Sequence, residues 1–187
     1  MRFGGYGLSL IMPETEKNPS DFDIAKDEFV TQWGALSSSW GISRTMAQIH
    51  ALLLVSPEAM HTDQIMDDLQ ISRGNAHGNL KELVSWGIVK SQVKKGDRKE
   101  YFVAEKDIWK MFCIIARERK RREIEPAKNV LENCARLTAD ADCEECKEFS
   151  HQMEHLAEFV DLFSSLLDKL SSSEESKAIP MAMKLLS

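Results

Sequence analysis

The residues best suited to chemistry lie between positions 72 and 99, and the chemistry they suit is recognition of a nucleic acid. Arginine side chains pair with guanine and asparagine side chains with adenine, while the amino end of a helix attracts phosphate. Residues of these types follow a serine that can cap a helix, and they form the polar face of one short segment. We expect this segment to be a helix that reads DNA. Its candidate contact residues are Ser72, Arg73, Gly74, Asn75, His77, Gly78, Asn79 and Lys81.

A second, basic group occupies a glycine-containing loop. β-branched and aromatic residues on either side of it, at 88–93 and 101–103, predict two strands joined in a hairpin. We expect the cations of the loop to straddle a DNA backbone, with Arg98 entering the adjacent minor groove. The alternative is an ordinary exposed turn, and without the preceding helix it would be preferred. The loop cations are Lys94, Lys95, Arg98 and Lys99.

Two glycines interrupt the candidate reading helix. Each costs a helix about 1 kcal/mol relative to alanine. That cost makes sense if the backbone at Gly74 and Gly78 must closely approach a DNA groove or phosphate. The competing interpretation is that the glycines only relieve packing and that the polar face is merely solvated.

The charge is unevenly distributed along the chain. The formal net charge is −6, which taken alone argues against a nucleic-acid partner. Within 72–100, however, seven basic residues face three acidic ones, whereas twelve acidic residues face five basic ones within 129–187. This asymmetry indicates one surface built for phosphate and another kept away from it.

The elements around these groups follow the order that a winged helix requires: two helices, a helix-turn-helix and a hairpin. Apolar periodicity, serine caps and glycine stops predict helices at 22–40, 44–55, 62–69 and 73–85. The expected fold class is mainly α, with a winged helix-turn-helix domain, a small β-hairpin wing and long C-terminal dimerisation helices. The residues expected to face inward on the fourth helix are Ala76, Leu80, Leu83 and Val84.

The pattern after the hairpin is helical throughout. One long segment runs from Ile108 to Pro126, where we expect a kink or break. The charged run 117–123 within it is interpreted as a solvated helix face held by pairs such as Glu118 with Arg122. A secondary phosphate contact is the alternative for this run.

The last predicted helix, 142–170, carries one long apolar stripe. No further core is left in the chain to cover that stripe, so we expect a second copy of the chain to do so in a homodimer. The stripe consists of Phe149, Met153, Leu156, Phe159, Val160, Phe163, Leu166, Leu167 and Leu170.

These patterns divide the chain into a disordered leader (1–22), a DNA-binding domain (23–104), a helical dimerisation region (105–170) and a C-terminal tail (171–187). The apolar stretch near Met1 is too short for a signal sequence or a membrane span. Cysteines without a secretory signal indicate the reducing cytosol. We therefore expect a cytoplasmic protein with no membrane partner and no cofactor. No catalytic constellation stands at a usable spacing, so an enzyme is not expected.

Cys143 and Cys146, followed by His151 and His155, offer ligand types that zinc accepts. Four ligands along three turns of one helix cannot converge tetrahedrally. We therefore expect no metal and favour half-exposed cysteines on a dimer helix, with a metal or thiol sensor as the alternative.

Aromatic residues suggest an effector site. Trp33, Trp40, Trp86, Trp109 and Phe112 could form a box that attracts a quaternary ammonium effector by cation–π interaction. Aromatics at helical spacing more often belong to a core, which is the favoured interpretation.

Four stretches, at 65–83, 86–89, 95–101 and 117–126, resemble the GbsR/MarR-like family of bacterial regulators. The Ser-Arg-Gly-Asn start of the reading helix and the Lys-Gly-Asp-Arg-Lys wing are fairly specific in combination. The resemblance implies a homodimeric repressor or activator whose terminal helices form the dimer interface and whose winged helices read a pseudo-palindrome. Some members control choline and glycine betaine genes.

The remaining alternative is a winged helix that docks only to proteins and binds no specific DNA. The basic reading helix and wing argue against it, because a protein-docking wing does not need positive charge.

Overall fold

Start and stop signals in the sequence define the helices of the first half of the chain. The structure is a computed structural model that describes residues 20–141 and 143–171. Ser20 and Asp23 form a capping box at the start of the first helix, and the Ser43 side chain accepts a hydrogen bond from the Met46 backbone N–H at the start of the second. Residues 21–104, called the winged-helix body below, contain α1 (Asp21–Leu36), the 3-10 turn η1 (Ser37–Trp40), α2 (Arg44–Val55), β1 (Met60–His61), α3 (Thr62–Leu69), α4 (Arg73–Trp86), β2 (Val89–Val93) and β3 (Glu100–Ala104).

The expected leader ends earlier than its predicted boundary. Asp21 and Phe22 belong to α1, because the capping box at Ser20 satisfies the first backbone N–H groups of the helix. The rest of the predicted leader, 1–19, lies outside the described residues, as does the predicted tail beyond Ser171.

The hairpin wing has a third strand that the sequence did not predict. The sheet order is β1-β3-β2, and both pairings are antiparallel. Met60 in β1 pairs with Phe102, and Val89 in β2 pairs with Ala104. β1 is only two residues long, too short to show the alternation that identifies a strand in a sequence. It ties the segment before α3 to the base of the wing.

The core lies where α2 packs beneath α4 and the sheet. Ile49, Leu52, Ile65 and Leu80 are fully buried there. Burial of each such side chain contributes roughly 1.5–3 kcal/mol relative to exposure. The inward stripe expected on α4 is confirmed, with Val84 only partly buried. This packing leaves the opposite face of α4 open to solvent.

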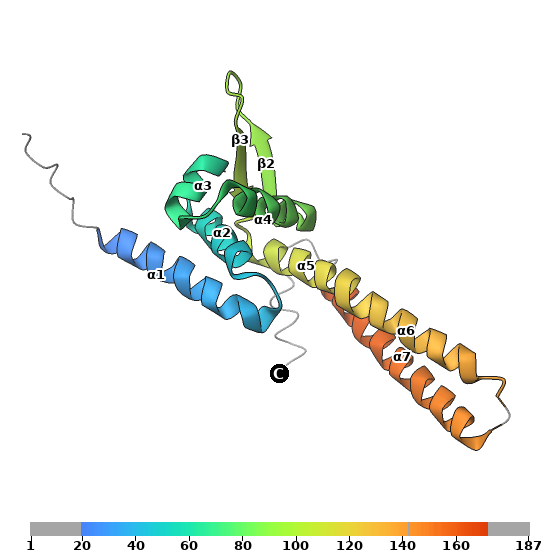
Figure 1. Ribbon diagram of the computed structural model, residues 1–187. Coiled ribbons are helices and arrows are strands. Elements are labelled where there is room, and N and C mark those ends of the chain that lie inside the picture. Colours follow the sequence, from blue (N-terminus) through green and yellow to red (C-terminus); the bar gives the residue numbers. More distant parts are fainter. Residues whose placement is uncertain (1–19, 142, 172–187) are drawn as a thin grey trace, which may run out of the picture.

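A long helical arm extends from the body (Figure 1). The helix does not break at Pro126 but runs on, with one π-helical turn directly before it. Proline has no N–H to donate, and the wider turn, in which the Glu125 N–H bonds to the Lys120 carbonyl, accommodates the change. The arm consists of α5 (Ile108–Arg119), the π turn η2 (Lys120–Ile124), α6 (Glu125–Thr138) and α7 (Glu144–Ser171).

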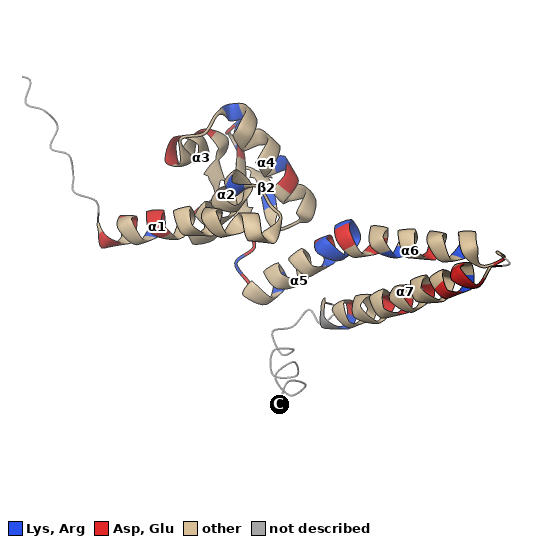
Figure 2. Ribbon diagram, turned by 60° about the horizontal axis from the view of Figure 1, so that its bottom comes forward, with Lys and Arg blue, Asp and Glu red and all other residues tan. Residues whose placement is uncertain are grey.

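The apolar stripe of α7 divides into two faces, so the expectation that the chain holds no partner for it is wrong in part. α7 folds back along α6, as Figures 1 and 2 both show, and Ala157 and Ser150 are buried against it. Ser150 donates a hydrogen bond of 3.1 Å to the Ala135 carbonyl, and Lys128 pairs with Asp161 at 2.6 Å. The other face remains uncovered. Its exposed residues are Phe149, Leu156, Phe159, Leu162, Phe163 and Leu166.

Cys143 and Cys146 are exposed and half-buried, as expected, but they form a disulfide, which the expectation of a reducing cytosol did not include. Cys143 precedes α7, and its sulfur turns back over the first helical turn to accept from the Cys146 N–H at 3.1 Å. Within the described residues no group of three His, Cys, Asp or Glu side chains could hold a metal ion. None of the helices described is long and apolar enough to cross a membrane.

Candidate nucleic-acid interface

α4 is fixed at both ends by local signals. The Ser72 side chain accepts a hydrogen bond from the Asn75 N–H, and Gly87 ends the helix at φ 81°. The preceding turn passes through Gln70 in the left-handed conformation at φ 52°, and Ile71 packs against the core. These contacts set the angle between α3 and α4 that a helix-turn-helix requires.

The outward face of α4 presents small, polar and basic residues. Arg73, Gly74, His77, Gly78 and Lys81 are all exposed. A Cβ atom built on either glycine would meet nothing within 4 Å. Packing within the chain therefore requires neither glycine, and the packing interpretation is wrong for both positions. No contact within the described residues explains why glycine, which destabilises a helix, stands at these two positions.

Asn75 and Asn79 both contact α2 or its cap, although Asn75 remains exposed. Asn79 is half-buried, accepts from the Ser43 hydroxyl at 2.8 Å, and donates to the Asn75 side chain at 2.7 Å. Asn75 in turn donates to the Thr45 hydroxyl at 3.4 Å. The Asn79 amide is thus used within the protein, and we leave it out of the proposed DNA contacts.

The wing exposes its cations at the tip. Lys94, Lys95 and Arg98 are exposed, and the Lys94 ammonium lies 4.2 Å from the centre of the Tyr101 ring. Asp97 braces the loop by accepting from the Lys99 N–H at 3.0 Å and from the Tyr101 hydroxyl at 2.7 Å. These two hydrogen bonds, that of the Lys99 N–H first, lower the pKa of Asp97.

One carboxylate joins the reading helix to the wing. Asp63, in the first turn of α3, pairs with Arg73 at 2.6 Å and with Lys99 at 3.3 Å. The Lys99 hydrogen bond and the nearby Arg73 charge hold its pKa below the usual value. The ionised carboxylate therefore positions two of the predicted DNA-binding cations, a role that sequence reasoning missed.

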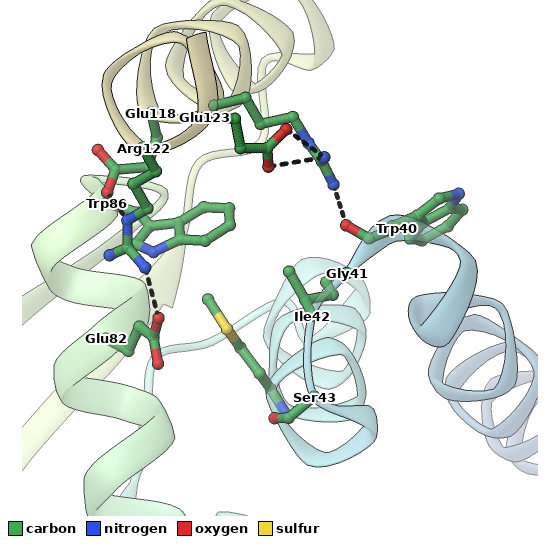
Figure 3. Close-up of a pocket in the computed structure, with 11 residues that line it drawn as sticks. Trp40, Gly41, Ile42, Ser43, Glu82, Trp86, Glu118, Arg122 and Glu123 are labelled. Atoms are coloured by element: carbon green, nitrogen blue, oxygen red, sulfur yellow. Dashed lines mark hydrogen bonds and ion pairs between the residues drawn. The ribbon is translucent and has the colours of Figure 1, made fainter. Parts of the chain in front are cut away.

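An ion pair connects the reading helix to the arm (Figure 3). Arg122, in η2, donates to Glu82 of α4 at 2.8 Å, and its guanidinium lies 5.0 Å from the centre of the Trp86 ring. On the other side of the same small pocket, of about 140 Å³, Arg119 donates to the Trp40 carbonyl and to Glu123. The π turn is thus held to both α4 and η1.

The charged run 117–123 is only partly a solvated face. Glu118 pairs with Arg122, as expected, but its side chain is buried, with the residue 7% exposed. Hydrogen bonds from Arg121, and also from Arg122, lower the pKa of Glu118. The reason for its burial is that the run lies at the joint between arm and body, where these side chains pack against α4.

The charges separate in space as they do in sequence. Figure 2 shows acidic residues recurring along α7 and a basic cluster at the joint between α5 and α6. The exposed cations of α4 and the wing belong to the opposite end of the molecule (Figure 1). A polyanion approaching the wing therefore does not meet the acidic helix.

The structure brings most of the predicted effector residues together. Trp33, Trp40, Trp86 and Phe112 line one cavity between the body and α5. Trp109 does not line it: its ring stacks on Phe112 at 5.3 Å, but the residue borders a different pocket.

The fold is that of a winged helix-turn-helix. The crystal structure of a transcriptional regulator has the same fold, with a TM-score of 0.66 and 21% identity over 79% of this chain and 96% of that one. The HTH-type transcriptional repressor GbsR of Bacillus subtilis (strain 168) is 25% identical over 185 residues, covering 90% of this chain and 99% of that protein. No protein-family model matches. The chain is thus similar to a GbsR repressor over nearly its whole length, and the predicted winged helix-turn-helix fold is confirmed.

Proposed function

We propose that this protein is a DNA-binding repressor that binds a pseudo-palindromic operator as a homodimer. The observation that carries the proposal is the pair of glycines on the open face of α4. Gly74 and Gly78 cost the helix about 1 kcal/mol each and have open space where a side chain would stand. A partner from outside the chain that approaches the helix backbone closely accounts for both.

In the proposed complex α4 enters the major groove and the wing follows the backbone. Arg73 and His77 face base edges, and Lys81 lies one turn further along the same face. Lys94 and Lys95 at the wing tip contact phosphates, which contributes affinity without sequence preference.

The homodimer is proposed to form through the uncovered face of α7. Phe159 is 66% exposed and Leu162 60%, on a helix of 28 residues. A continuous apolar strip of this length is unusual on a monomer's surface. A second copy brings an identical strip, and a two-fold axis parallel to α7 would place the two winged-helix bodies at the same end of the pair, where both can reach one duplex. The name of the Bacillus subtilis relative supports repression as the outcome of binding.

Regulation by an effector is proposed to act at the joint between body and arm. The cavity lined by Trp33 and Trp40 adjoins α5, and Trp86 ends the reading helix. A ligand that fits one arrangement of body and arm better than another would shift the spacing of the two reading helices.

The test of DNA binding compares wing variants by fluorescence anisotropy on a random-sequence duplex at two salt concentrations. Lys95→Ala should weaken binding on every sequence and make its salt dependence shallower, because a phosphate contact is lost. Lys147→Ala, which removes an exposed cation from the acidic helix α7, is the matched control and should change neither.

A protein-docking winged helix is the alternative outcome. Wild-type protein that binds no duplex at low salt, or equal losses for Lys95→Ala and Lys147→Ala, would support that alternative and contradict the proposed function.

A further inference from the structure

The disulfide between Cys143 and Cys146 lies at the cap of a helix. Cys143 occupies the N-cap position of α7, because its carbonyl accepts from the Lys147 N–H at 3.2 Å and its sulfur from the Cys146 N–H at 3.1 Å. In most helices a serine, threonine, aspartate or asparagine oxygen caps this position, and sulfur is only a weak acceptor. The covalent bond to Cys146 therefore fixes the first turn of α7 where a cap hydrogen bond does so in other helices.

The start of α7 is otherwise exposed. Within 143–149 only Cys146 is half-buried, and the other residues are open to solvent. The first buried residue of the helix is Ser150, which donates to the Ala135 carbonyl of α6 at 3.1 Å. About two helical turns thus precede this buried contact. The sulfur bridge is therefore a major constraint on them.

The position of the bond is typical of a reactive disulfide rather than of a structural one. It closes a loop between residues only three positions apart, which restricts the unfolded chain far less than a long loop would. Cys143 is exposed, so a thiol can reach its sulfur. Exposed disulfides are the labile ones, and in the reducing compartment that the sequence predicts, most disulfides are transient and redox-active.

The difference in exposure assigns different roles to the two cysteines. Cys143 is open to a small molecule, whereas Cys146 is half-buried. Cys146 is also the third residue of α7, where the free backbone N–H groups of the first turn stabilise a thiolate. Cys143 is therefore the sulfur that an outside thiol or disulfide meets, and Cys146 is the sulfur that closes or leaves.

The surrounding charge selects among small disulfides. Within 140–148 five residues are acidic and one is basic. Glu144, Glu145 and Glu148 are exposed beside the two cysteines. Such a negative surface repels an anionic reactant and attracts a cationic one.

We propose that Cys143 and Cys146 form a reversible dithiol–disulfide site that exchanges with low-molecular-weight disulfides, cationic aminothiol disulfides above all. The Cys143 thiolate attacks one sulfur of the disulfide RSSR, forms a mixed disulfide and expels RS⁻. The Cys146 thiolate then attacks the Cys143 sulfur and expels the second RS⁻. The protons of the two protein thiols end on the two RSH molecules, so one RSSR is reduced and the protein is oxidised. The exchange depends on neither DNA binding nor dimer formation.

The site lies at the end of the arm that is far from the winged-helix body (Figure 1). Phe149, which is 44% exposed, begins the uncovered face of α7 three residues after Cys146. Oxidation thus fixes the turn from which that face starts. This consequence for pairing, unlike the exchange itself, rests on the proposed homodimer.

Mass spectrometry of the full chain, reduced and then freed of reductant, tests the exchange. The probes are cystamine, which is cationic, neutral 2-hydroxyethyl disulfide, and anionic dithiodiglycolate. Each should return the protein to a form lighter by two hydrogens. At low salt cystamine should react roughly ten-fold faster than dithiodiglycolate, and the ratio should shrink at high salt. Protein that keeps its thiols, or that accumulates mixed disulfides without closing the bond, would overturn the proposal, and equal rates for all probes would overturn the substrate class.

Three serine variants test the roles of the cysteines. Cys146→Ser should trap one cystamine half on Cys143, because no second thiol is present to expel it. Cys143→Ser should react several-fold more slowly, since the remaining thiol is half-buried. Cys134→Ser, which removes a half-buried free cysteine from α6, is the control and should keep the rate and the closure of the wild type. Equal reaction rates of Cys143→Ser and Cys146→Ser would refute the assigned roles.

Amide hydrogen exchange tests the effect on the helix. The amides of 147–149 should exchange faster in the reduced protein than in the oxidised one, whereas those of 157–160, further along α7, should not change. Equal protection of 147–149 in both forms would show that the disulfide does not fix this turn. None of these measurements involves DNA, so their failure would leave the proposed function standing, and a protein that binds no DNA would leave the exchange site standing.

Discussion

Asp63 lies 2.6 Å from Arg73, so the carboxylate of α3 holds the first basic side chain of the reading helix before any DNA is present. The same carboxylate lies 3.3 Å from Lys99 at the foot of the wing. An acidic residue in a DNA-binding surface reduces the attraction of phosphate, yet it also fixes the direction of the cations beside it. Asp63 thus lowers the affinity for DNA but fixes the orientation of Arg73 and Lys99.

Asp63→Asn should therefore raise affinity for random DNA and lower specificity. The substitution removes a negative charge and releases Arg73 and Lys99, so we expect tighter binding to random duplexes and a steeper salt dependence. The ratio of specific to random affinity should fall, since Arg73 is no longer directed. Fluorescence anisotropy with an operator duplex and with a random duplex measures this ratio. Asp67→Asn removes the same charge from an exposed site on α3 and should leave the ratio unchanged.

Gly74→Ala and Gly78→Ala should make the protein more stable and weaker in DNA binding. Both helix positions have room for a methyl group, so Gly78→Ala in the helix interior should raise the free energy of unfolding by about 1 kcal/mol, and Gly74→Ala, at the second residue of α4, by less. The same methyl groups would stand between the helix backbone and DNA. Denaturant titration measures the free energy of unfolding, and fluorescence anisotropy measures the affinity for DNA. Thr31→Ala, on the exposed surface of α1, should raise stability without changing DNA binding. Glycine variants that gain stability and keep full affinity would contradict the close approach.

Phe159→Glu should convert the dimer to a monomer. The substitution places a carboxylate on the uncovered face of α7, where pairing of two copies would bury it, at a cost of roughly 2 kcal/mol or more. Light scattering reports the mass, and binding to a two-half-site duplex should weaken in parallel. Val93→Glu, at an equally exposed apolar residue of the wing, is the control for oligomeric state. A wild-type chain that is already monomeric would refute the proposed interface.

Stability should fall as the pH drops from about 6.5 to about 4, because of His50. Its pKa is about 4 in the folded protein against an ordinary value of 6.5, chiefly because the side chain is buried. Between these two pH values the unfolded chain binds the proton and the folded protein does not. The free energy of unfolding therefore falls by about 3 kcal/mol by the time the pH reaches about 4. His50→Leu should lack this contribution, whereas His77→Gln, at an exposed position, should retain it. Urea titrations across the window provide the comparison.

Local signals were sufficient to predict the reading helix and the wing. The Ser72 cap, the apolar positions on α4 and Gly87 are all encoded within one segment, and each lies where the sequence placed it. The divided stripe of α7 could not be predicted in the same way. One face meets α6 and the other does not, and which residues belong to each depends on how the two helices pack.

The contacts between α4, the wing and the arm could not be predicted from the sequence either, because they join residues that are far apart along the chain. Arg122 and Glu82 are separated by forty residues, and nothing local pairs them. Asp63 was one acidic residue among several before the fold placed it between α4 and the wing. Trp109 lies one helical turn from Phe112 and stacks on it, yet only Phe112 lines the cavity beside the body, and Trp109 borders another pocket.

The most direct test of the central claim is selection of duplexes from a random pool by the purified protein at two salt concentrations, followed by sequencing of the retained DNA. The account predicts an enriched pseudo-palindrome with half-sites roughly 34–36 Å apart and retention that falls steeply with salt. A pool that is neither retained nor enriched at low salt would contradict it and show that α4 and the wing do not read DNA.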